Sequence, residues 1–257
     1  MSTLKDKLTL ITGASAGIGE ATARAFAREG AKLILTARRE KKLRALAKEL
    51  AEKHHTESLV MPLNLREHDK VEETLLNLPE QWHAVDILVN NAGLVRGLQK
   101  LYTMESADWH EVIDVNVKGL LAVTNSIVPG MVERGRGHII NLGSIAGREA
   151  YPNGAVYCAT KFAVRALSRG LKMDLNETPI RVTSIDPGLV ETEFSVVRFK
   201  GDREKAKEPY KGITPLHPED IADAIVWSAA RPAHVNISEM LIFPTAQASS
   251  TQVHREV

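Results

Sequence analysis

The chain has 257 residues and a formal net charge of +1, with 33 Lys and Arg against 32 Asp and Glu. Because positive and negative charges nearly cancel, the protein has no large positive potential to attract nucleic acid or an anionic membrane surface, and we expect small molecules as partners. The one cysteine cannot form an internal disulfide, which fits a reducing compartment. Because residues 1–7 lack an apolar signal core and no apolar run approaches the roughly 20 residues that a bilayer needs, we expect a cytoplasmic protein without membrane attachment.

Short apolar runs alternate with longer stretches of helical period along the whole chain. This rhythm is typical of a parallel sheet with helices on both faces. Strands are predicted at 7–12, 32–36, 58–63, 86–90, 138–142, 181–185 and 240–243, and helices at 17–29, 39–53, 67–77, 105–133, 154–176 and 218–230. Because no linker or repeat interrupts the pattern, we predict one doubly wound α/β domain over residues 1–257, with a seven-stranded parallel sheet.

A glycine-rich loop, Thr12 to Gly19, follows the first predicted strand and opens the first predicted helix. Glycines permit a tight turn and close backbone approach, and the helix N-terminus offers N–H groups and a positive dipole to a pyrophosphate. The spacing differs from the common Gly-x-Gly-x-x-Gly, but the position at the first strand-to-helix crossover favours a dinucleotide site. The residues expected to bind the cofactor here are Gly13, Ser15, Gly17, Ile18 and Gly19. The alternative is a purely structural turn.

Two arginines, Arg38 and Arg39, follow the second predicted strand. NAD enzymes usually present a carboxylate to the ribose 2′-hydroxyl at this place. A guanidinium instead matches the oxygens of a 2′-phosphate, so we predict NADP in preference to NAD. The alternative is that both arginines only begin a charged, solvated helix.

Tyr157 and Lys161 lie four residues apart in a predicted helix, which places a phenol and an ammonium on one helix face. A neighbouring cation stabilises phenolate, so we expect Lys161 to lower the pKa of Tyr157 from about 10 towards the range of proton transfer near neutral pH. Ser144 follows the predicted strand 138–142, where its hydroxyl is suited to hold a substrate oxygen.

Cys158 is expected to be a buried thiol, and the histidines show no metal-ligand spacing, so no metal is expected.

The segment 191–217 is predicted to be irregular, polar and basic. A loop this long in a compact domain is usually functional, and we expect a lid over the site. The alternative is a solvated surface excursion. We call residues 191–217 the lid segment.

With these motifs in order, the chain resembles the short-chain dehydrogenase/reductase family over nearly its whole length. The resemblance rests on the loop 12–19, on 90–93, on Ser144 with Tyr157 and Lys161, and on 186–192. It implies a Rossmann fold, an oxidoreductase and a homotetramer. It also implies that Asn91, Ala92 and Gly93 back the adenosine side of the cofactor, and that Pro187, Gly188, Val190 and Thr192 hold the nicotinamide amide.

The resemblance implies two further roles. Asn116 matches the fourth catalytic position of the family, where an asparagine bends its helix and holds a water that links the lysine to solvent. Asn64, followed by Leu65, stands where the family commonly has an aspartate that accepts from the adenine amino group. An asparagine keeps an acceptor oxygen and loses the charge.

Within the family, segments 188–195, 197–202 and 216–223 resemble NADP-dependent dehydrogenases of 3-hydroxy acids, including L-serine and allo-threonine. This resemblance implies that Tyr157 takes the proton of a β-hydroxyl while hydride passes to nicotinamide, and that Lys161 also bonds the nicotinamide ribose. Such a substrate carries a carboxylate, so we expect a cation near the site, either Arg148 or Arg198, although each is alternatively an exposed arginine. The alternatives are a reductase of neutral ketones or aldehydes and a non-enzymatic nucleotide sensor or scaffold.

Overall fold

A parallel sheet forms the centre of the protein. The computed structural model describes residues 4–256, so residues 1–3 and 257 of the predicted domain lie outside the described part. The strand order is β3-β2-β1-β4-β5-β6-β7. The strands are β1 Leu8–Thr12, β2 Lys32–Ala37, β3 Ser58–Pro62, β4 Ile87–Asn90, β5 His138–Leu142, β6 Arg181–Pro187 and β7 Glu239–Ile242. The predicted seven-stranded parallel sheet is confirmed, and the bounds differ only at strand ends.

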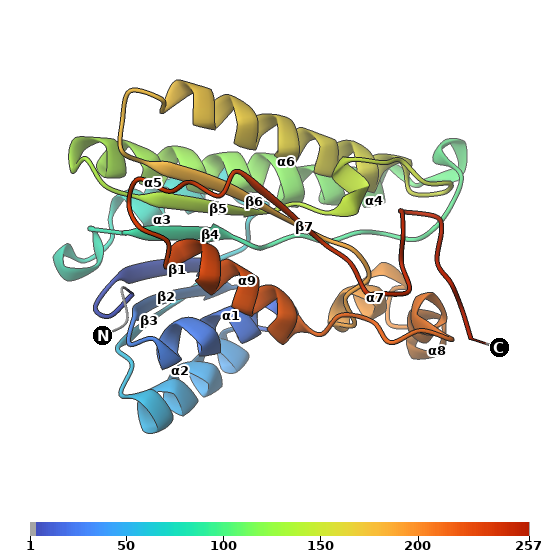
Figure 1. The fold of residues 1–257 in the computed structure, drawn as a ribbon, viewed down its shortest axis with the longest axis horizontal. Coiled ribbons are helices and arrows are strands. Elements are labelled where there is room, and N and C mark those ends of the chain that lie inside the picture. Colours follow the sequence, from blue (N-terminus) through green and yellow to red (C-terminus); the bar gives the residue numbers. More distant parts are fainter. Residues whose placement is uncertain (1–3, 257) are drawn as a thin grey trace.

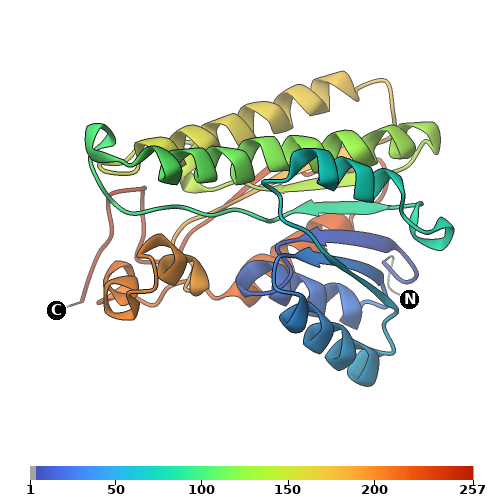
Figure 2. The ribbon, with the colours of Figure 1, turned by 180° about the vertical axis from the view of Figure 1, so that it is seen from behind.

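Helices cover both faces of the sheet, as predicted. The long helices are α1 Gly17–Arg28, α2 Glu40–His54, α3 His68–Leu76, α4 Ser106–Ile113, α5 Leu120–Glu133, α6 Ala155–Asp174 and α9 Pro218–Ala229. Figure 1 shows α1, α2 and α9 on one face and α5 and α6 on the other, and the reverse view in Figure 2 places α3 beside α5. This arrangement is the doubly wound α/β fold.

The buried strands carry apolar side chains to both faces because successive residues of a strand point in opposite directions. In β2, Leu33 and Leu35 join the core cluster under α1, together with Phe26, whereas Ile34 joins the cluster under α5 with Ile139. All five side chains are fully buried, and each contributes about 1.5–3 kcal/mol of hydrophobic free energy. Two-sided burial explains why these strands are continuous apolar runs.

The predicted helix 105–133 is not a single α-helix. A π-helical segment, Asp114–Gly119, separates α4 from α5. A π-helical turn contains one extra residue and often marks a functional site, and periodicity in sequence does not reveal it. The run Ser106–Glu133 is long and apolar enough to cross a membrane, but half of its apolar window is buried, and α5 packs against α3 and β4. It is therefore a core helix of this fold.

The strand order reverses between β1 and β4, which are neighbours in the sheet. Loops that leave the carboxyl ends of such strands diverge and open a crevice, which is where ligands bind in open α/β sheets. The lid segment lies beyond this edge (Figure 1). It contains two short helices that were not predicted, α7 Glu193–Arg198 and α8 Arg203–Lys207. Thr192 and Asp202 cap them by accepting hydrogen bonds from backbone N–H groups.

Candidate active site

One cavity of about 790 Å³ opens at the carboxyl ends of the strands. It brings together residues from every motif identified in the sequence. The predicted site residues that line it are Gly13, Ser15, Gly17, Ile18, Arg38, Arg39, Asn64, Leu65, Asn91, Ala92, Gly93, Ser144, Tyr157, Lys161, Pro187, Gly188, Val190, Thr192 and Arg198. Three predicted site residues do not line it: Gly19, Asn116 and Arg148.

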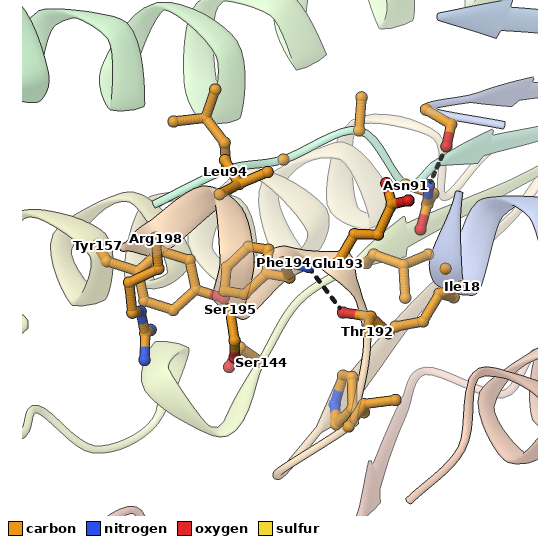
Figure 3. A pocket seen from close by; sticks show the side chains of 18 of the residues that line it. Ile18, Asn91, Leu94, Ser144, Tyr157, Thr192, Glu193, Phe194, Ser195 and Arg198 are labelled. Atoms are coloured by element: carbon orange, nitrogen blue, oxygen red, sulfur yellow. Dashed lines mark hydrogen bonds between the residues drawn. The ribbon is translucent and has the colours of Figure 1, made fainter. Parts of the chain in front are cut away.

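Tyr157 and Ser144 lie side by side at one end of the cavity (Figure 3). Tyr157 is in the first turn of α6, and Ser144 follows β5, so the sheet and the helix fix their positions. The Ser144 hydroxyl is hydrogen-bonded to the phenol and accepts a hydrogen bond from Ala146 N at 3.1 Å. A substrate oxygen placed between the two hydroxyl groups would contact both.

Burial dominates the ionisation of Tyr157. The phenol is only 8% exposed, and this desolvation raises its pKa well above 10; Tyr151 adds to the rise, and Arg198 and Ser144 oppose it. The expectation that Lys161 lowers this pKa is therefore wrong for this structure, in which Arg198 is the cation acting on the phenol. Tyr157 is held protonated at neutral pH, ready to donate a proton.

Lys161 lies one helical turn beyond Tyr157 and is also buried. Its Nζ donates to Leu142 O at 2.7 Å and lies 5.9 Å from the centre of the Tyr157 ring. Burial lowers the pKa of Lys161 to about 8, and the charge of Asp186 opposes this change. Lys161 is therefore a cation that a modest change in its surroundings converts to a neutral amine.

Arg148 does not reach the cavity, although it follows Ser144 closely in sequence. Its guanidinium donates to Asp186 Oδ2 at 2.8 Å and 2.6 Å, and it also pairs with Glu239. Asp186 is 1% exposed and accepts a further hydrogen bond from Ser184 Oγ at 2.6 Å. A buried carboxylate needs a cationic partner, and the guanidinium of Arg148 is occupied in pairing with Asp186. The expectation that Arg148 binds a substrate carboxylate is therefore wrong.

Asn116 lies in the π-helical segment, behind the cavity wall. Its side-chain oxygen accepts from Leu94 N at 2.8 Å, and its amide nitrogen donates to Leu94 O at 2.8 Å and to Thr160 Oγ1 at 3.1 Å. A Cβ added to Gly93 would lie 3.5 Å from Asn116 Oδ1 and 3.7 Å from Lys161 Nζ. Asn116 therefore positions the loop that passes over Lys161.

The glycine loop is tied to the loop after β4. Thr12 Oγ1 accepts hydrogen bonds from Asn91 N at 3.0 Å and Ala92 N at 2.9 Å. Gly13 and Gly17 have φ angles of +70° and +55°, which favour glycine. Gly19 faces inward instead of the cavity, since a Cβ there would lie 2.5 Å from Gly13 O. Its contribution is therefore close packing of the loop.

The predicted arginine pair lines the far end of the cavity. Arg38 is 56% exposed and approaches Glu111 only to 3.9 Å. Arg39 donates to Ser15 Oγ at 3.1 Å and to Glu193 Oε2 at 2.6 Å. Asn64 lies nearby, and its amide donates to Glu67 Oε1 at 3.0 Å. Arg38 is thus the freer of the two guanidinium groups.

The reacting end of the cavity includes aromatic residues that sequence reasoning missed, namely Tyr151, Phe194 and Tyr210. Arg198 lies among them: its Nη2 donates to Tyr151 Oη at 3.1 Å, and its guanidinium carbon is 5.8 Å from the centre of the Tyr157 ring. Its Nε is buried without a partner among residues 4–256. The only signal in the sequence was aromatic residues within and before a polar segment.

Comparison with known proteins agrees with this geometry. The model of the short chain dehydrogenase family matches residues 7–202. The NADP-dependent 3-hydroxy acid dehydrogenase YdfG of Salmonella typhi is 49% identical over 250 residues, which cover 96% of this chain and 99% of that protein. Sulfoacetaldehyde reductase 2 of Chromohalobacter salexigens is 44% identical over 244 residues, which cover 95% and 96%.

A solved structure, the closed form of serine dehydrogenase complexed with NADP+, superposes with a TM-score of 0.89 at 45% identity. The match covers 97% of this chain and all of that one. Fold, motifs and sequence similarity agree along the length of the protein, and the chain belongs to the short-chain dehydrogenase family.

Proposed function

We propose that this protein is an NADP-dependent dehydrogenase of small 3-hydroxy acids such as L-serine, allo-threonine, 3-hydroxyisobutyrate or 3-hydroxypropionate. The observation that carries the proposal is the position of Arg198, a cation with a buried Nε that lacks a partner among the described residues, beside the Tyr157 ring. A substrate hydroxyl at Tyr157 and Ser144 would leave its carboxylate within reach of this cation. The relatives named for 3-hydroxy acid and serine oxidation support the same substrate class.

The cavity fits NADP along its length. Gly13 and Gly17 leave room at the N-terminus of α1 for a pyrophosphate, and Arg38 and Arg39 offer guanidinium groups to a 2′-phosphate. The residues proposed to bind the remainder of the cofactor are Ser15, Ile18, Asn64, Leu65, Asn91, Ala92, Gly93, Tyr157, Lys161, Pro187, Gly188, Val190 and Thr192, with Gly19 as packing support. When bound, the nicotinamide supplies or accepts the hydride.

The proton is handled by Tyr157, with Ser144 fixing the reacting oxygen. In reduction of an aldehyde the protonated phenol donates its proton to the carbonyl oxygen. In oxidation the phenol must first lose its own proton, which burial disfavours, and then accepts the hydroxyl proton of the substrate. Holding this oxygen in line with Tyr157 supplies several kcal/mol of the barrier reduction. Lys161 lies in the next turn, where its ammonium is placed to hold a ribose hydroxyl, and Asn116 keeps the neighbouring loop in place.

The lid segment is proposed to close over the substrate. Phe194 packs at 5.6 Å, centre to centre, from the Tyr157 ring, and Ser195 Oγ is hydrogen-bonded to Tyr210 Oη at 2.7 Å. We expect these contacts to exclude water from the reacting end when the lid segment closes. We also propose that residues 1–257 act as one domain in the cytoplasm. Exposed apolar side chains on α6, such as Phe162 and Met173, support a homotetramer, which light scattering of the purified protein will test.

A second candidate is the reduction of a short aldehyde that carries a sulfonate. Arg198 provides charge and N–H donors for either a carboxylate or a sulfonate, and one relative is named for sulfoacetaldehyde. The two substrate classes differ in the size and charge distribution of the anion, while the chemistry at Tyr157 is the same.

The test is a reduced-nicotinamide absorbance assay of the purified protein with NADP and with NAD. The substrates are the four 3-hydroxy acids, the methyl ester of 3-hydroxypropionate, and sulfoacetaldehyde with reduced cofactor. We expect NADP-dependent oxidation of at least one acid and a much lower kcat/KM for the ester. A higher kcat/KM for sulfoacetaldehyde than for every acid would favour the second candidate. Equal kcat/KM for acid and ester would refute the first candidate, and if sulfoacetaldehyde is also no better a substrate, both candidates fail in favour of a neutral-substrate reductase.

A further inference from the structure

Glu193 joins the lid segment to the arginine pair at the far end of the cavity. Its carboxylate, in the first turn of α7, accepts hydrogen bonds from Arg39 Nη1 at 2.6 Å and from Lys42 Nζ at 2.8 Å. Arg39 also donates to Ser15, through Nε to Oγ at 3.1 Å and through Nη2 to the backbone O at 3.3 Å. One guanidinium therefore bridges the glycine loop and the lid segment, which are remote in sequence.

The charges at this end of the cavity are unbalanced. Arg38, Arg39 and Lys42 are cations, and Glu193 is the carboxylate bonded to two of them. Arg38 has only a distant approach to Glu111, whose strongest ion pair is with Arg96. A 2′-phosphate, with about −1.5 to −2 charge near neutral pH, would neutralise the excess. A phosphate that also binds Arg39 and Lys42 must share their N–H donors with Glu193.

The ion pairs of Glu193 are weak enough to be displaced. The side chains of Arg39 and Glu193 are 45% and 49% exposed, and exposed pairs of this kind contribute little to stability. A phosphate carries more charge than a carboxylate and accepts more hydrogen bonds from guanidinium groups. We propose that Glu193 competes with the 2′-phosphate of NADP for Arg39 and Lys42, so that filling the adenosine end of the cavity loosens the first turn of α7. This inference rests on the proposed NADP dependence.

The loosening is confined to one end of α7. Its other end is held by Gly97 N, which donates to Arg198 O at 2.8 Å, and by the ion pair of Lys200 Nζ with Asp108 Oδ2 at 2.9 Å. Between these points α7 carries Phe194, which lies against Tyr157. Loosening the first turn changes the constraint on Phe194, which lies beside Tyr157. Glu193 thereby links occupation of the 2′-phosphate site to the reacting end, and this link operates with NADP and not with NAD.

The first test is cofactor affinity in the absence of substrate. Glu193→Gln removes the competing charge, so the Kd of NADP should fall roughly two- to fivefold, as expected for an exposed ion pair, while the Kd of NAD stays unchanged. Calorimetry measures both. The matched control is Glu204→Gln, which removes the same charge from an exposed lid residue that pairs with Lys207 at 2.8 Å and does not line the cavity. It should change neither affinity.

Equal changes for both cofactors, no change for NADP, or weaker NADP binding in Glu193→Gln would overturn the proposal. Failure of the proposed function has a different signature, because the wild-type protein would then bind NAD as tightly as NADP.

The second test isolates the 2′-phosphate by using fragments that lack nicotinamide. Adenosine 2′,5′-bisphosphate and 5′-AMP differ only in that group. Hydrogen exchange reports the protection of amides 197–199, which in helix geometry donate to the carbonyl groups of residues 193–195 in the first turn. The bisphosphate, but not 5′-AMP, should accelerate exchange in the wild-type protein. Glu193→Gln should exchange rapidly from the start and show no further response. Unchanged or slower exchange in the wild-type protein with the bisphosphate would contradict the coupling.

Discussion

The side chain of Asn116 holds both backbone polar groups of Leu94, accepting from its N–H and donating to its C=O, each at 2.8 Å. This pair of hydrogen bonds joins the π-helical segment to the loop that passes over Lys161. Since Leu94 is buried, water could not take the place of Asn116 as the partner of these two backbone groups. The position of the loop therefore depends on one amide side chain.

Asn116→Ala should destabilise the protein and slow catalysis. The N–H of Leu94 would be left buried without its partner, at a cost of about 1–3 kcal/mol in the free energy of unfolding. Urea unfolding and kcat measure the two effects. Asn176→Ala is the control, because Asn176 is exposed beyond the end of α6. Equal stability of both variants would show that the Leu94 bonds contribute nothing.

The charge of Lys161 should make stability depend on pH in a defined direction. Burial lowers the pKa of Lys161 from 10.5 to about 8, with Asp186 opposing. Between these values the unfolded chain binds more protons than the native one, so the free energy of unfolding rises with pH. Relative to Lys161→Met, the wild-type protein should therefore gain about 3 kcal/mol as pH rises from 8 to 10.5, and the difference should be constant below 8.

Urea unfolding of both proteins across this range measures the difference between them, which cancels the titration of other groups. A difference that stays constant, or that favours the variant as pH rises, would mean that the ammonium of Lys161 is not penalised by burial.

Arg198 should select for an anionic substrate. Arg198→Met removes charge-assisted hydrogen bonds that contribute about 1.5–3 kcal/mol, so KM for a 3-hydroxy acid should rise roughly 10- to 100-fold. KM for the methyl ester should change little. Arg203→Met is the matched control, because Arg203 is exposed in the lid segment and does not line the cavity. If acid and ester lose affinity equally, Arg198 shapes the pocket without binding the anion.

Arg148 should act through Asp186 and not through the substrate. Arg148→Met leaves a carboxylate that is 1% exposed without its cation, which costs about 3–5 kcal/mol in unfolding free energy. Asp186→Asn added to Arg148→Met should recover much of this loss, because the buried charge is then gone. Thermal or urea unfolding of the wild-type protein, both single variants and the double variant measures the coupling, with Arg203→Met at an exposed residue as control. Additive losses would show that the pair is not coupled.

Local patterns predicted the sheet, the covering helices and the glycine loop, because apolar strand runs, helical periodicity and loop glycines are each visible within a few consecutive residues. The resemblance implied a bend at Asn116, but the π-helical segment itself was missed because helical periodicity does not reveal one extra residue in a turn. The helices α7 and α8 are shorter than the window in which helical periodicity is visible.

Two electrostatic predictions failed for one reason, which is that both depend on contacts remote in sequence. Arg148 lies close to Ser144 in the chain, but Asp186 and Glu239, which arrive on neighbouring strands, capture its guanidinium. The spacing of Tyr157 and Lys161 indicates a helix face and says nothing of the burial that raises the pKa of the phenol. The partners of Arg198 likewise become visible only when the lid segment is folded over the sheet.

In the proposed reaction the hydroxyl of Tyr157 transfers the proton beside bound NADP, and Tyr157→Phe removes only that oxygen. Single-turnover absorbance at the reduced-nicotinamide band, together with the Kd of NADP, measures the effect. We expect NADP still to bind and the rate to fall by at least about 10²-fold, the usual contribution of a positioned acid or base. An undiminished rate of hydride transfer with NADP still bound would contradict it.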